Sequence, residues 1–147
     1  MRVLKFGGTS VATAEARRAA AALVRAQKGP VAVVVSALDG VTEMLDEAAR
    51  AAAAGNRRLL ARNIADLRAK HDGPLLDELE RVLAGLAALG ELTPRSRDLV
   101  LSFGERLSAP MFAAEIGSQA VALDGAAAGI VTDEQWGEAG PLREVTE

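Results

Sequence analysis

Two short apolar runs near the amino terminus predict β-strands. The first run is Val3–Phe6. The second, Val31–Val35, is a continuous run rich in β-branched residues, which is typical of a strand buried on both faces of a parallel sheet. Between them, apolar residues recur at helical spacing over Ala12–Ala26, and Gly29-Pro30 ends that helix. Strand, helix and strand in this order predict a right-handed βαβ unit.

Helical patterns fill the centre of the chain. The predicted helices are Val41–Ala54, Arg57–Lys70, Leu75–Leu89 and a long one that follows Thr93 and ends near Ile116. The second and third form an antiparallel hairpin inserted into the α/β pattern. We expect Asp39 to cap the helix that begins at Val41. Thr93 should cap the long helix, with Pro94 at its first helical position.

The long helix and the segment after it predict further features. Pro110 lies inside the helix and should kink it. The helix has one apolar stripe, made of Leu99, Val100, Phe103, Leu107, Met111 and Ala114. Gln119–Leu123 predicts a third strand, and Gly129–Thr132 a fourth, very short one.

Composition limits the classes of function. Half of the 147 residues are hydrophobic, which suffices for a packed core, and there is no cysteine for disulfides or thiolate metal sites. The net charge of −3, from 17 basic and 20 acidic residues, gives no footprint for nucleic acid. No apolar run is long enough to span a bilayer, and the first residues do not resemble a signal peptide. We therefore expect a soluble, cytoplasmic protein without nucleic-acid or membrane partners.

The segment KFGGTSV, Lys5–Val11, is the first candidate for chemistry. Glycines between a strand and a helix let backbone N–H groups converge on an anion, and the helix amino terminus and a lysine would add positive potential. The pattern is neither a P-loop nor a dinucleotide-binding fingerprint. A phosphate site and a plain tight turn with a surface lysine remain equally good interpretations of the pattern alone.

Polar residues follow the second strand and recur in the long helix. Ser36 and Thr42 flank the loop after that strand, at the sheet edge where parallel sheets bind ligands. As plain alternatives, Ser36 is a turn residue and Thr42 a first-turn helix residue. Glu105 lies opposite the apolar stripe, so exposure explains it, as does a Ser102–Glu105 capping box.

Three other features carry no clear chemistry. His71 is predicted to be a solvated turn residue, and Trp136 to be half-buried packing in a polar loop. The acidic residues show no spacing that indicates a metal site.

Four motifs together resemble the aspartokinase family. KFGGTSV at Lys5–Val11 is similar to its signature, and VVVSALDGVTEML at Val33–Leu45 to its second motif. LGELTPRSRDLVLSFGERLSAP at Leu89–Pro110 is similar to the third, and GIVTD at Gly129–Asp133 to a fourth. The motifs follow the family's order over nearly the whole chain.

The resemblance implies a fold and a reaction. The fold is the three-layer α/β/α sandwich of the amino-acid-kinase type, here incomplete and with an inserted helical hairpin. The reaction is ATP-dependent phosphorylation of the β-carboxylate of L-aspartate to 4-phospho-L-aspartate, the first step of lysine, threonine and methionine biosynthesis. Mg²⁺ would bridge the phosphates of ATP.

The resemblance also assigns roles to residues. Lys5 would be catalytic and, with Phe6, Gly7 and Gly8, would bind the phosphates of ATP. Ser36, Thr42 and Glu105 would bind L-aspartate, with Glu105 pairing with its ammonium group. No protein ligand to a metal is implied.

The chain departs from the family in extent. It lacks the glycine-rich segment that helps to bind aspartate, the half that holds adenine and ribose, and the regulatory domains. We therefore interpret residues 1–147 as the amino-acid-binding part of a catalytic domain, weakly active or inactive alone, in a homo-oligomer or with a complementing chain. The alternatives are a non-catalytic assembly or regulatory module that uses the hairpin as a partner surface, or another amino-acid kinase acting on a different acid.

Overall fold

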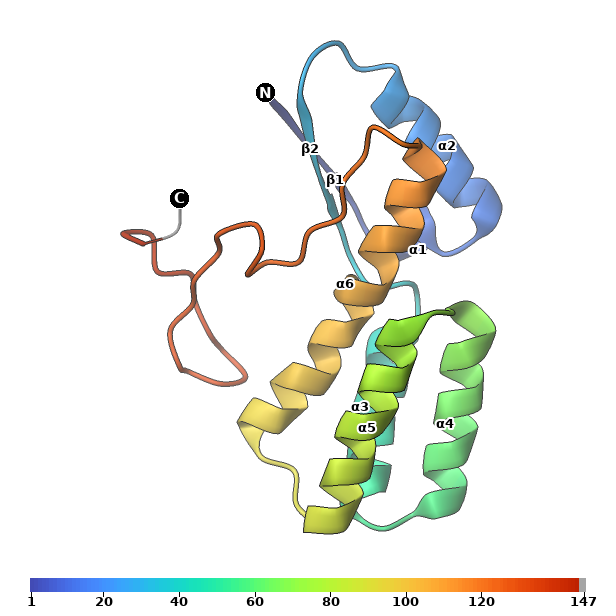
Figure 1. Cartoon of the computed structure of the whole chain (residues 1–147), viewed down its shortest axis with the longest axis vertical. Helices are drawn as coiled ribbons and strands as arrows, with labels where there is room; N and C mark the ends of the chain where they lie inside the picture. Colours follow the sequence, from blue (N-terminus) through green and yellow to red (C-terminus); the bar gives the residue numbers. More distant parts are fainter. Residues whose placement is uncertain (146–147) are drawn as a thin grey trace. The chain divides into compact units, whose positions relative to one another are not determined.

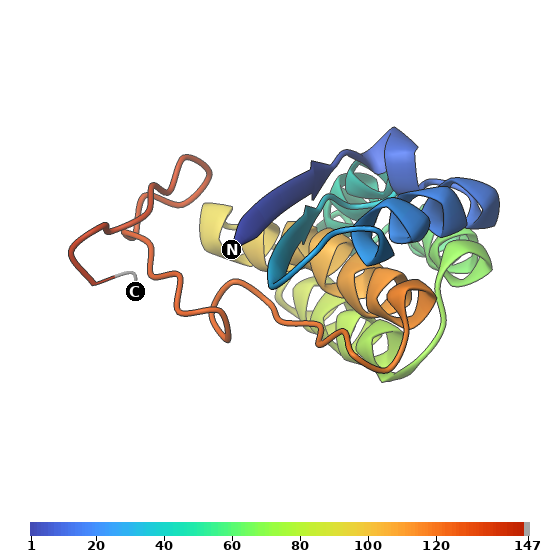
Figure 2. The same cartoon turned by 90° about the horizontal axis from the view of Figure 1, so that it is seen from above.

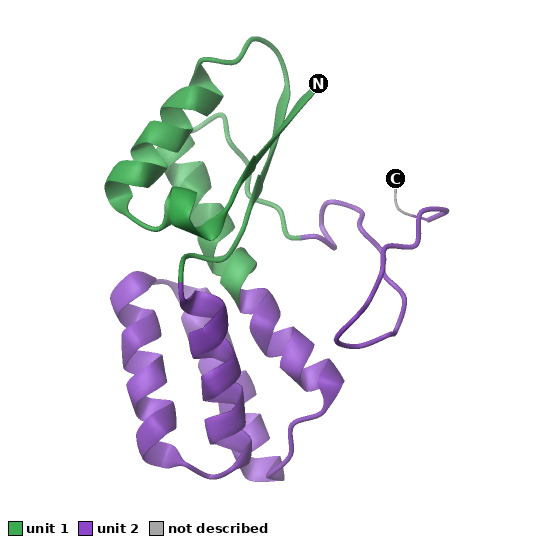
Figure 3. Cartoon of the chain, turned by 180° about the vertical axis from the view of Figure 1, so that it is seen from behind, with its two compact units in different colours: residues 1–39, 104–124 green, residues 40–103, 125–147 purple. Residues whose placement is uncertain are grey.

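The protein forms two compact units (Figure 3). The computed structural model describes residues 1–145, so the last two residues of the predicted 1–147 domain lie outside this range. The first unit contains residues 1–39 and 104–124, and the second contains residues 40–103 and the chain from residue 125 onward. Within the described residues, no helix is both long enough and apolar enough to cross a membrane.

The first unit begins with the predicted βαβ arrangement (Figure 1). Strand β1 (Arg2–Phe6) is followed by the short helix α1 (Gly8–Val11), helix α2 (Ala14–Arg25) and strand β2 (Val31–Val35). The two strands pair in parallel, with Arg2 opposite Val31 and Phe6 opposite Val35, and they lie side by side in Figure 2. The predicted order of elements is confirmed: the helix predicted over 12–26 forms as α2, and the structure adds the short helix α1 before it.

The two faces of this sheet differ in their environment. Phe6 faces helix α6 (Pro94–Ile116), where its ring lies 5.5 Å from that of Phe112. Side chains alternate along a strand, so Val3 and Val34 lie on the opposite face, where they are 64% and 49% exposed. The expectation that β2 is buried on both faces is therefore wrong. A run of apolar residues indicates which side chains are hydrophobic, but it does not indicate whether other elements cover each face of the strand.

A cavity of about 900 Å³ lies on the covered side of β2. Its walls come from α2, α6, the strand itself and the segment 117–123, and it is open to solvent on one side. The predicted third strand at 119–123 does not form. Backbone pairing requires a neighbouring strand at hydrogen-bonding distance, and this segment is separated from β2 by the cavity, with Val121 80% exposed.

The second unit is helical. Helices α3 (Val41–Ala53), α4 (Arg57–Lys70) and α5 (Pro74–Leu89) match the predictions to within a residue or two, and α4 and α5 both pack on α3. The predicted stripe of α3 is buried throughout: Leu45, Ala48, Ala49 and Ala52. The leucines that α5 contributes to the core are Leu76, Leu79, Leu83 and Leu86. At the hairpin, Arg68 of α4 binds Asp77 and Glu80 of α5.

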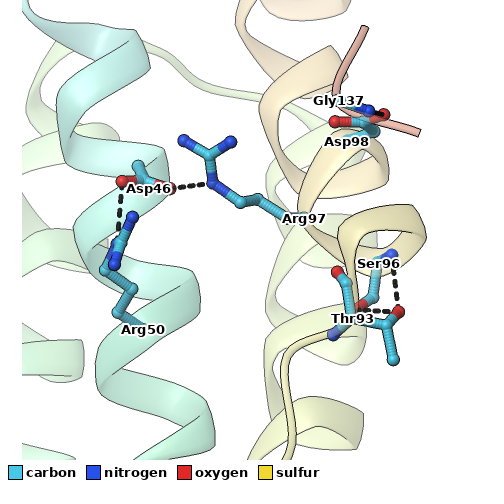
Figure 4. A network of polar contacts seen from close by, with 7 residues as sticks. All are labelled: Asp46, Arg50, Thr93, Ser96, Arg97, Asp98 and Gly137. Carbon is cyan, nitrogen blue, oxygen red and sulfur yellow. Dashed lines mark hydrogen bonds and ion pairs between the residues drawn. The ribbon is translucent and has the colours of Figure 1, made fainter. Parts of the chain in front are cut away.

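Helix α6 starts as predicted. Thr93 accepts a hydrogen bond from the Ser96 N–H at 3.1 Å, and the Ser96 hydroxyl accepts one from the Thr93 N–H at 3.0 Å (Figure 4). These reciprocal bonds satisfy backbone donors that the first turn leaves without partners. The helix then continues through Pro110 to Ile116 without ending.

Three sequence expectations are wrong in detail. The amino-terminal cap of α3 is Gly40, in a left-handed conformation with φ 76°, and not Asp39. His71 is buried, at 4% exposure, because the turn between α4 and α5 folds onto the helices. In α6, Leu99 is exposed and Phe112 is buried, so the predicted stripe does not hold along the whole helix.

The carboxyl-terminal segment of the second unit contains little regular structure. The predicted strand 129–132 is reduced to one antiparallel bridge, between Thr132 and Pro141. Two contacts attach the segment to α6: the Gly137 N–H donates to Asp98 at 2.6 Å, and the Arg95 guanidinium lies 5.4 Å from the centre of the Trp136 ring. Trp136 is exposed, at 42%, so it is less buried than predicted.

The ion pair between α3 and α6 gives a prediction for pH dependence. Arg97 Nε donates to Asp46 at 2.6 Å, and Arg50 donates to the other carboxylate oxygen (Figure 4). The hydrogen bond from Arg97, assisted by that from Arg50, holds the pKa of Asp46 below its ordinary value despite partial burial. The carboxylate therefore stabilises the fold above its unfolded-state pKa, and this contribution is lost as pH falls through the lower folded-state pKa.

Asp46→Asn should lower the free energy of unfolding by about 1 kcal/mol near neutral pH, and the difference should shrink and then vanish as the pH falls through the lowered folded-state pKa of Asp46. Urea titrations followed by circular dichroism at several pH values measure it. Asp66→Asn is the control, since the Asp66 carboxylate lies 3.7 Å from Arg62 in a more exposed pair. A difference between wild type and Asp46→Asn that stays constant with pH would contradict this account.

Candidate functional site

The glycine loop, residues Lys5–Gly8, leads from β1 into α1. Lys5 and Gly7 are exposed, and Gly7 is extended, with φ −74° and ψ 169°. A glycine has no side chain to cap the first N–H groups of α1, and none caps them in the structure. A Cβ added at Gly7 would meet no atom within 4 Å, so the loop has an open side there.

Gly8 is the point at which this loop contacts a second one. The second loop, Ser36–Asp39, follows β2 and is named the 36–39 loop. A Cβ on Gly8 would lie 2.7 Å from the carbonyl oxygen of Ala37 and 3.4 Å from the nitrogen of Asp39. Both neighbours are backbone atoms that cannot rotate away, so the close approach of the two loops requires glycine at this position.

Helix α6 holds the 36–39 loop from its other side. The Ala37 N–H donates to Oε1 of Glu105 at 3.3 Å. The hydroxyl of Ser108, one turn later, donates to the carbonyl oxygen of Ser36 at 2.8 Å and also lies 3.2 Å from the carbonyl oxygen of Glu105. The Ser36 N–H donates to the Phe6 carbonyl oxygen at 3.2 Å, which ties the 36–39 loop to the end of β1.

The structure brings most of the predicted site residues into one unit. The glycine loop, Ser36 and Glu105 all belong to the first unit, at the carboxyl ends of the two parallel strands. Thr42 lies in the second unit, exposed in the first turn of α3. Lys5 alternates with Phe6 along β1, so it lies on the face of the sheet opposite α6.

The plain explanations for Glu105 account for only part of its position. Residues 102–105 lie in the middle of α6, and the Ser102 hydroxyl donates to the Leu99 carbonyl oxygen at 2.7 Å, so there is no capping box. Glu105 is exposed, as the helical projection predicts, yet one of its oxygens binds the 36–39 loop. The remaining acceptor positions of its carboxylate stay available to a cationic group.

Sequence reasoning missed Ser108, which is 1% exposed. A signal for it existed: Gly104, Ser108 and Phe112 recur every four residues and therefore share one face of α6. All three are buried. Small residues on a helix face let another backbone approach closely, and the 36–39 loop does so here.

Metal-ligating side chains do not gather into a large cluster in the described part of the chain. Within residues 1–145, no group of three or more histidine or carboxylate side chains is placed to hold a metal ion.

Comparison with known proteins identifies relatives of this chain. The sequence model of the amino acid kinase family matches residues 1–147. Aspartokinase 1, chloroplastic, of Arabidopsis thaliana is 35% identical over 91% of this chain, and the aspartokinase of Chlamydia muridarum is 31% identical over 95% of it. The chain spans 27% and 33% of the lengths of these two relatives.

Solved structures share its fold. E. coli aspartokinase III in complex with aspartate and ADP (R-state) matches with a TM-score of 0.81 and 24% identity, over 99% of this chain and 36% of that chain. The same protein in complex with lysine and aspartate (T-state) matches with a TM-score of 0.75 and 26% identity. These matches confirm the predicted fold class, an incomplete amino-acid-kinase-type α/β fold.

The two glycines of the loop give opposite predictions. Gly8→Ala should lower the free energy of unfolding by about 1–3 kcal/mol, because its methyl group would overlap the Ala37 carbonyl oxygen. Gly7→Ala is the matched control and should be nearly neutral, since its position is open and its φ is negative. Urea unfolding of both variants measures this. An equal or larger loss for Gly7→Ala would show that the loops do not approach as described.

Proposed function

Because this chain belongs to the amino acid kinase family, we propose that it is the amino-acid-binding part of an aspartate kinase. The reaction is transfer of the γ-phosphoryl group of ATP to the β-carboxylate of L-aspartate, which gives 4-phospho-L-aspartate, the first step of lysine, threonine and methionine biosynthesis. The observation that carries the proposal is the Glu105 carboxylate, held by the 36–39 loop beside the glycine loop. Relatives named aspartokinases support it.

Each predicted site residue has a role in this proposal. Lys5 stabilises negative charge on the transferred phosphoryl group, and the backbone of Phe6, Gly7 and Gly8 contacts the ATP phosphates. Glu105 binds the ammonium group of L-aspartate with the oxygens that the Ala37 N–H leaves available. Ser36 lies near the reacting carboxylate, and Thr42 contributes a hydroxyl to substrate binding.

The chemical step needs little beyond positioning. The β-carboxylate of aspartate is ionised at neutral pH, so no general base is required. ATP supplies the phosphoryl group, with Mg²⁺ as its counter-ion, and the proposal names no protein ligand for this ion. What the chain contributes is orientation of the attacking oxygen and charge neutralisation beside it.

The extent of the chain determines how the proposal is tested. It spans 27% of Arabidopsis aspartokinase 1, and we propose that turnover requires the remaining part of an aspartokinase as a complementing chain. Aspartyl phosphate formed by the mixture is trapped with hydroxylamine, and L-aspartate binding to this chain alone is followed by NMR. A chain that is folded and oligomeric but binds neither L-aspartate nor ATP would instead support a non-catalytic module.

The surface of the helical hairpin, α4 and α5, does not support the alternative of a non-catalytic module. The leucines that would form a partner surface on α5 are buried in the second unit. Of its large apolar side chains, that of Leu89 at the end of the helix is largely exposed. We therefore retain the non-catalytic module only as an outcome of the binding test.

Lys5→Ala should reduce turnover of the complemented enzyme by about 10²–10³-fold, the usual effect of removing one group that stabilises transition-state charge. Lys28→Ala, another exposed lysine of the same unit, is the control and should leave turnover unchanged. The hydroxylamine assay at saturating ATP and L-aspartate measures both variants. Unchanged turnover in Lys5→Ala would remove Lys5 from the mechanism.

Glu105→Gln should raise the dissociation constant for L-aspartate by about 10–100-fold and leave that for ATP unchanged. The glutamine still has an oxygen to accept from the Ala37 N–H, but the charge that attracts the ammonium group is gone. Glu115→Gln, on the same helix, is the control. Titrations with each ligand measure the constants, and a loss confined to ATP would refute the assigned role.

A further inference from the structure

The two contacts between α6 and the 36–39 loop act on a single peptide group. Ser108 donates to the carbonyl oxygen of Ser36, and Glu105 accepts from the N–H of Ala37. This oxygen and this N–H belong to the same peptide bond, which is trans. In a trans peptide the two groups point in opposite directions, so the two side chains bind it from opposite sides. We name this arrangement the peptide clamp.

The peptide clamp limits the motion that the loop would otherwise allow. A peptide plane in a loop can rotate about its two flanking bonds, which exchanges the directions of its N–H and C=O groups. Such a rotation here would take the N–H away from Glu105 and the oxygen away from Ser108 at once. The next carbonyl, that of Ala37, is already in close contact with Gly8, so the orientation of the clamped peptide also governs the contact between the two loops.

Burial makes the Ser108 side of the clamp the firmer one. Ser108 is 1% exposed, and its bond to Ser36 is 2.8 Å long. Glu105 is exposed, and its bond to Ala37 is 3.3 Å long. Water competes with an exposed hydrogen bond more effectively than with a buried one, so the orientation of the peptide is set mainly by Ser108.

From this geometry we infer that Ser108 is a positioning residue for the amino-acid substrate. Its hydroxyl fixes the Ser36–Ala37 peptide, the peptide N–H fixes one oxygen of Glu105, and the rest of that carboxylate is thereby directed at the ammonium group of the substrate. The role in substrate binding rests on the proposed function, whereas the clamp itself does not. Ser108 touches neither the substrate nor the nucleotide in this account.

The clamp is tested on the whole 147-residue chain without any ligand. The hydrogen-exchange rate of the Ala37 amide, measured by NMR, should rise about tenfold in Ser108→Ala, as expected for losing one hydrogen bond of ordinary strength. Ser102→Ala is the matched control, because the Ser102 hydroxyl binds the Leu99 carbonyl within α6. Ser108→Thr keeps the hydroxyl and should restore slow exchange.

Two outcomes would overturn the clamp. One is an Ala37 amide that exchanges equally in wild type and Ser108→Ala. The other is faster exchange throughout the β1–β2 ladder in Ser108→Ala, which would show that Ser108 supports the packing of the whole unit and not one peptide. Either result can be read without any knowledge of the protein's activity.

The substrate role is tested separately by titration. The dissociation constant for L-aspartate should rise about tenfold in Ser108→Ala, while that for ATP, and both constants in Ser102→Ala, stay unchanged. If wild type binds no L-aspartate, the proposed function fails and the exchange result still decides the clamp. If wild type binds it and Ser108→Ala binds it equally well, the positioning role fails and the proposed function stands.

Discussion

The contact between Gly8 and the Ala37 carbonyl oxygen is the constraint on which the candidate site depends. It joins the loops that follow two parallel strands, and it leaves no room for a Cβ at Gly8. Parallel strands end at one edge of the sheet, but that alone leaves their loops free to diverge. The close approach of the backbones brings the glycine loop next to the 36–39 loop; under the proposed function these two loops bind the phosphates and the amino acid.

Helix α6 supplies the complementary constraint from the other side. Its buried face carries Ser108, where a larger apolar residue would give more burial but would not bind the backbone of the 36–39 loop. A buried hydroxyl is costly unless it is hydrogen-bonded, and Ser108 bonds the loop's backbone. The sequence thus exchanges some hydrophobic burial in this region for a defined orientation of one peptide.

The sequence predicts local features well and tertiary ones poorly. The bounds of β2 and α4, the Thr93 cap and the buried stripe of α3 follow from spacing and capping chemistry, which act over a few residues. The missing strand at 119–123 depends on a neighbour that no local pattern reports. The stripe of α6 fails for a related reason: residues 94–103 and 104–116 belong to different units, so a single helical projection does not describe both parts.

The candidate site shows the same division between local and tertiary information. The motifs predict the glycine loop, Ser36 and Glu105 as site residues. The need for glycine at residue 8 and the contact of Ser108 with the 36–39 loop depend on the tertiary structure, which the motifs do not describe. Because side chains alternate along β1, Lys5 and Phe6 lie on opposite faces of the sheet. Phe6 faces α6, and Lys5 faces the side on which Val3 and Val34 are exposed. Under the proposed function, α6 and Glu105 hold the amino acid from one side of the sheet, whereas the nucleotide reaches Lys5 from the other. The turn at Gly7 and Gly8 lies between these two sides, so it is the part of the chain at which a phosphoryl group can pass from one ligand to the other.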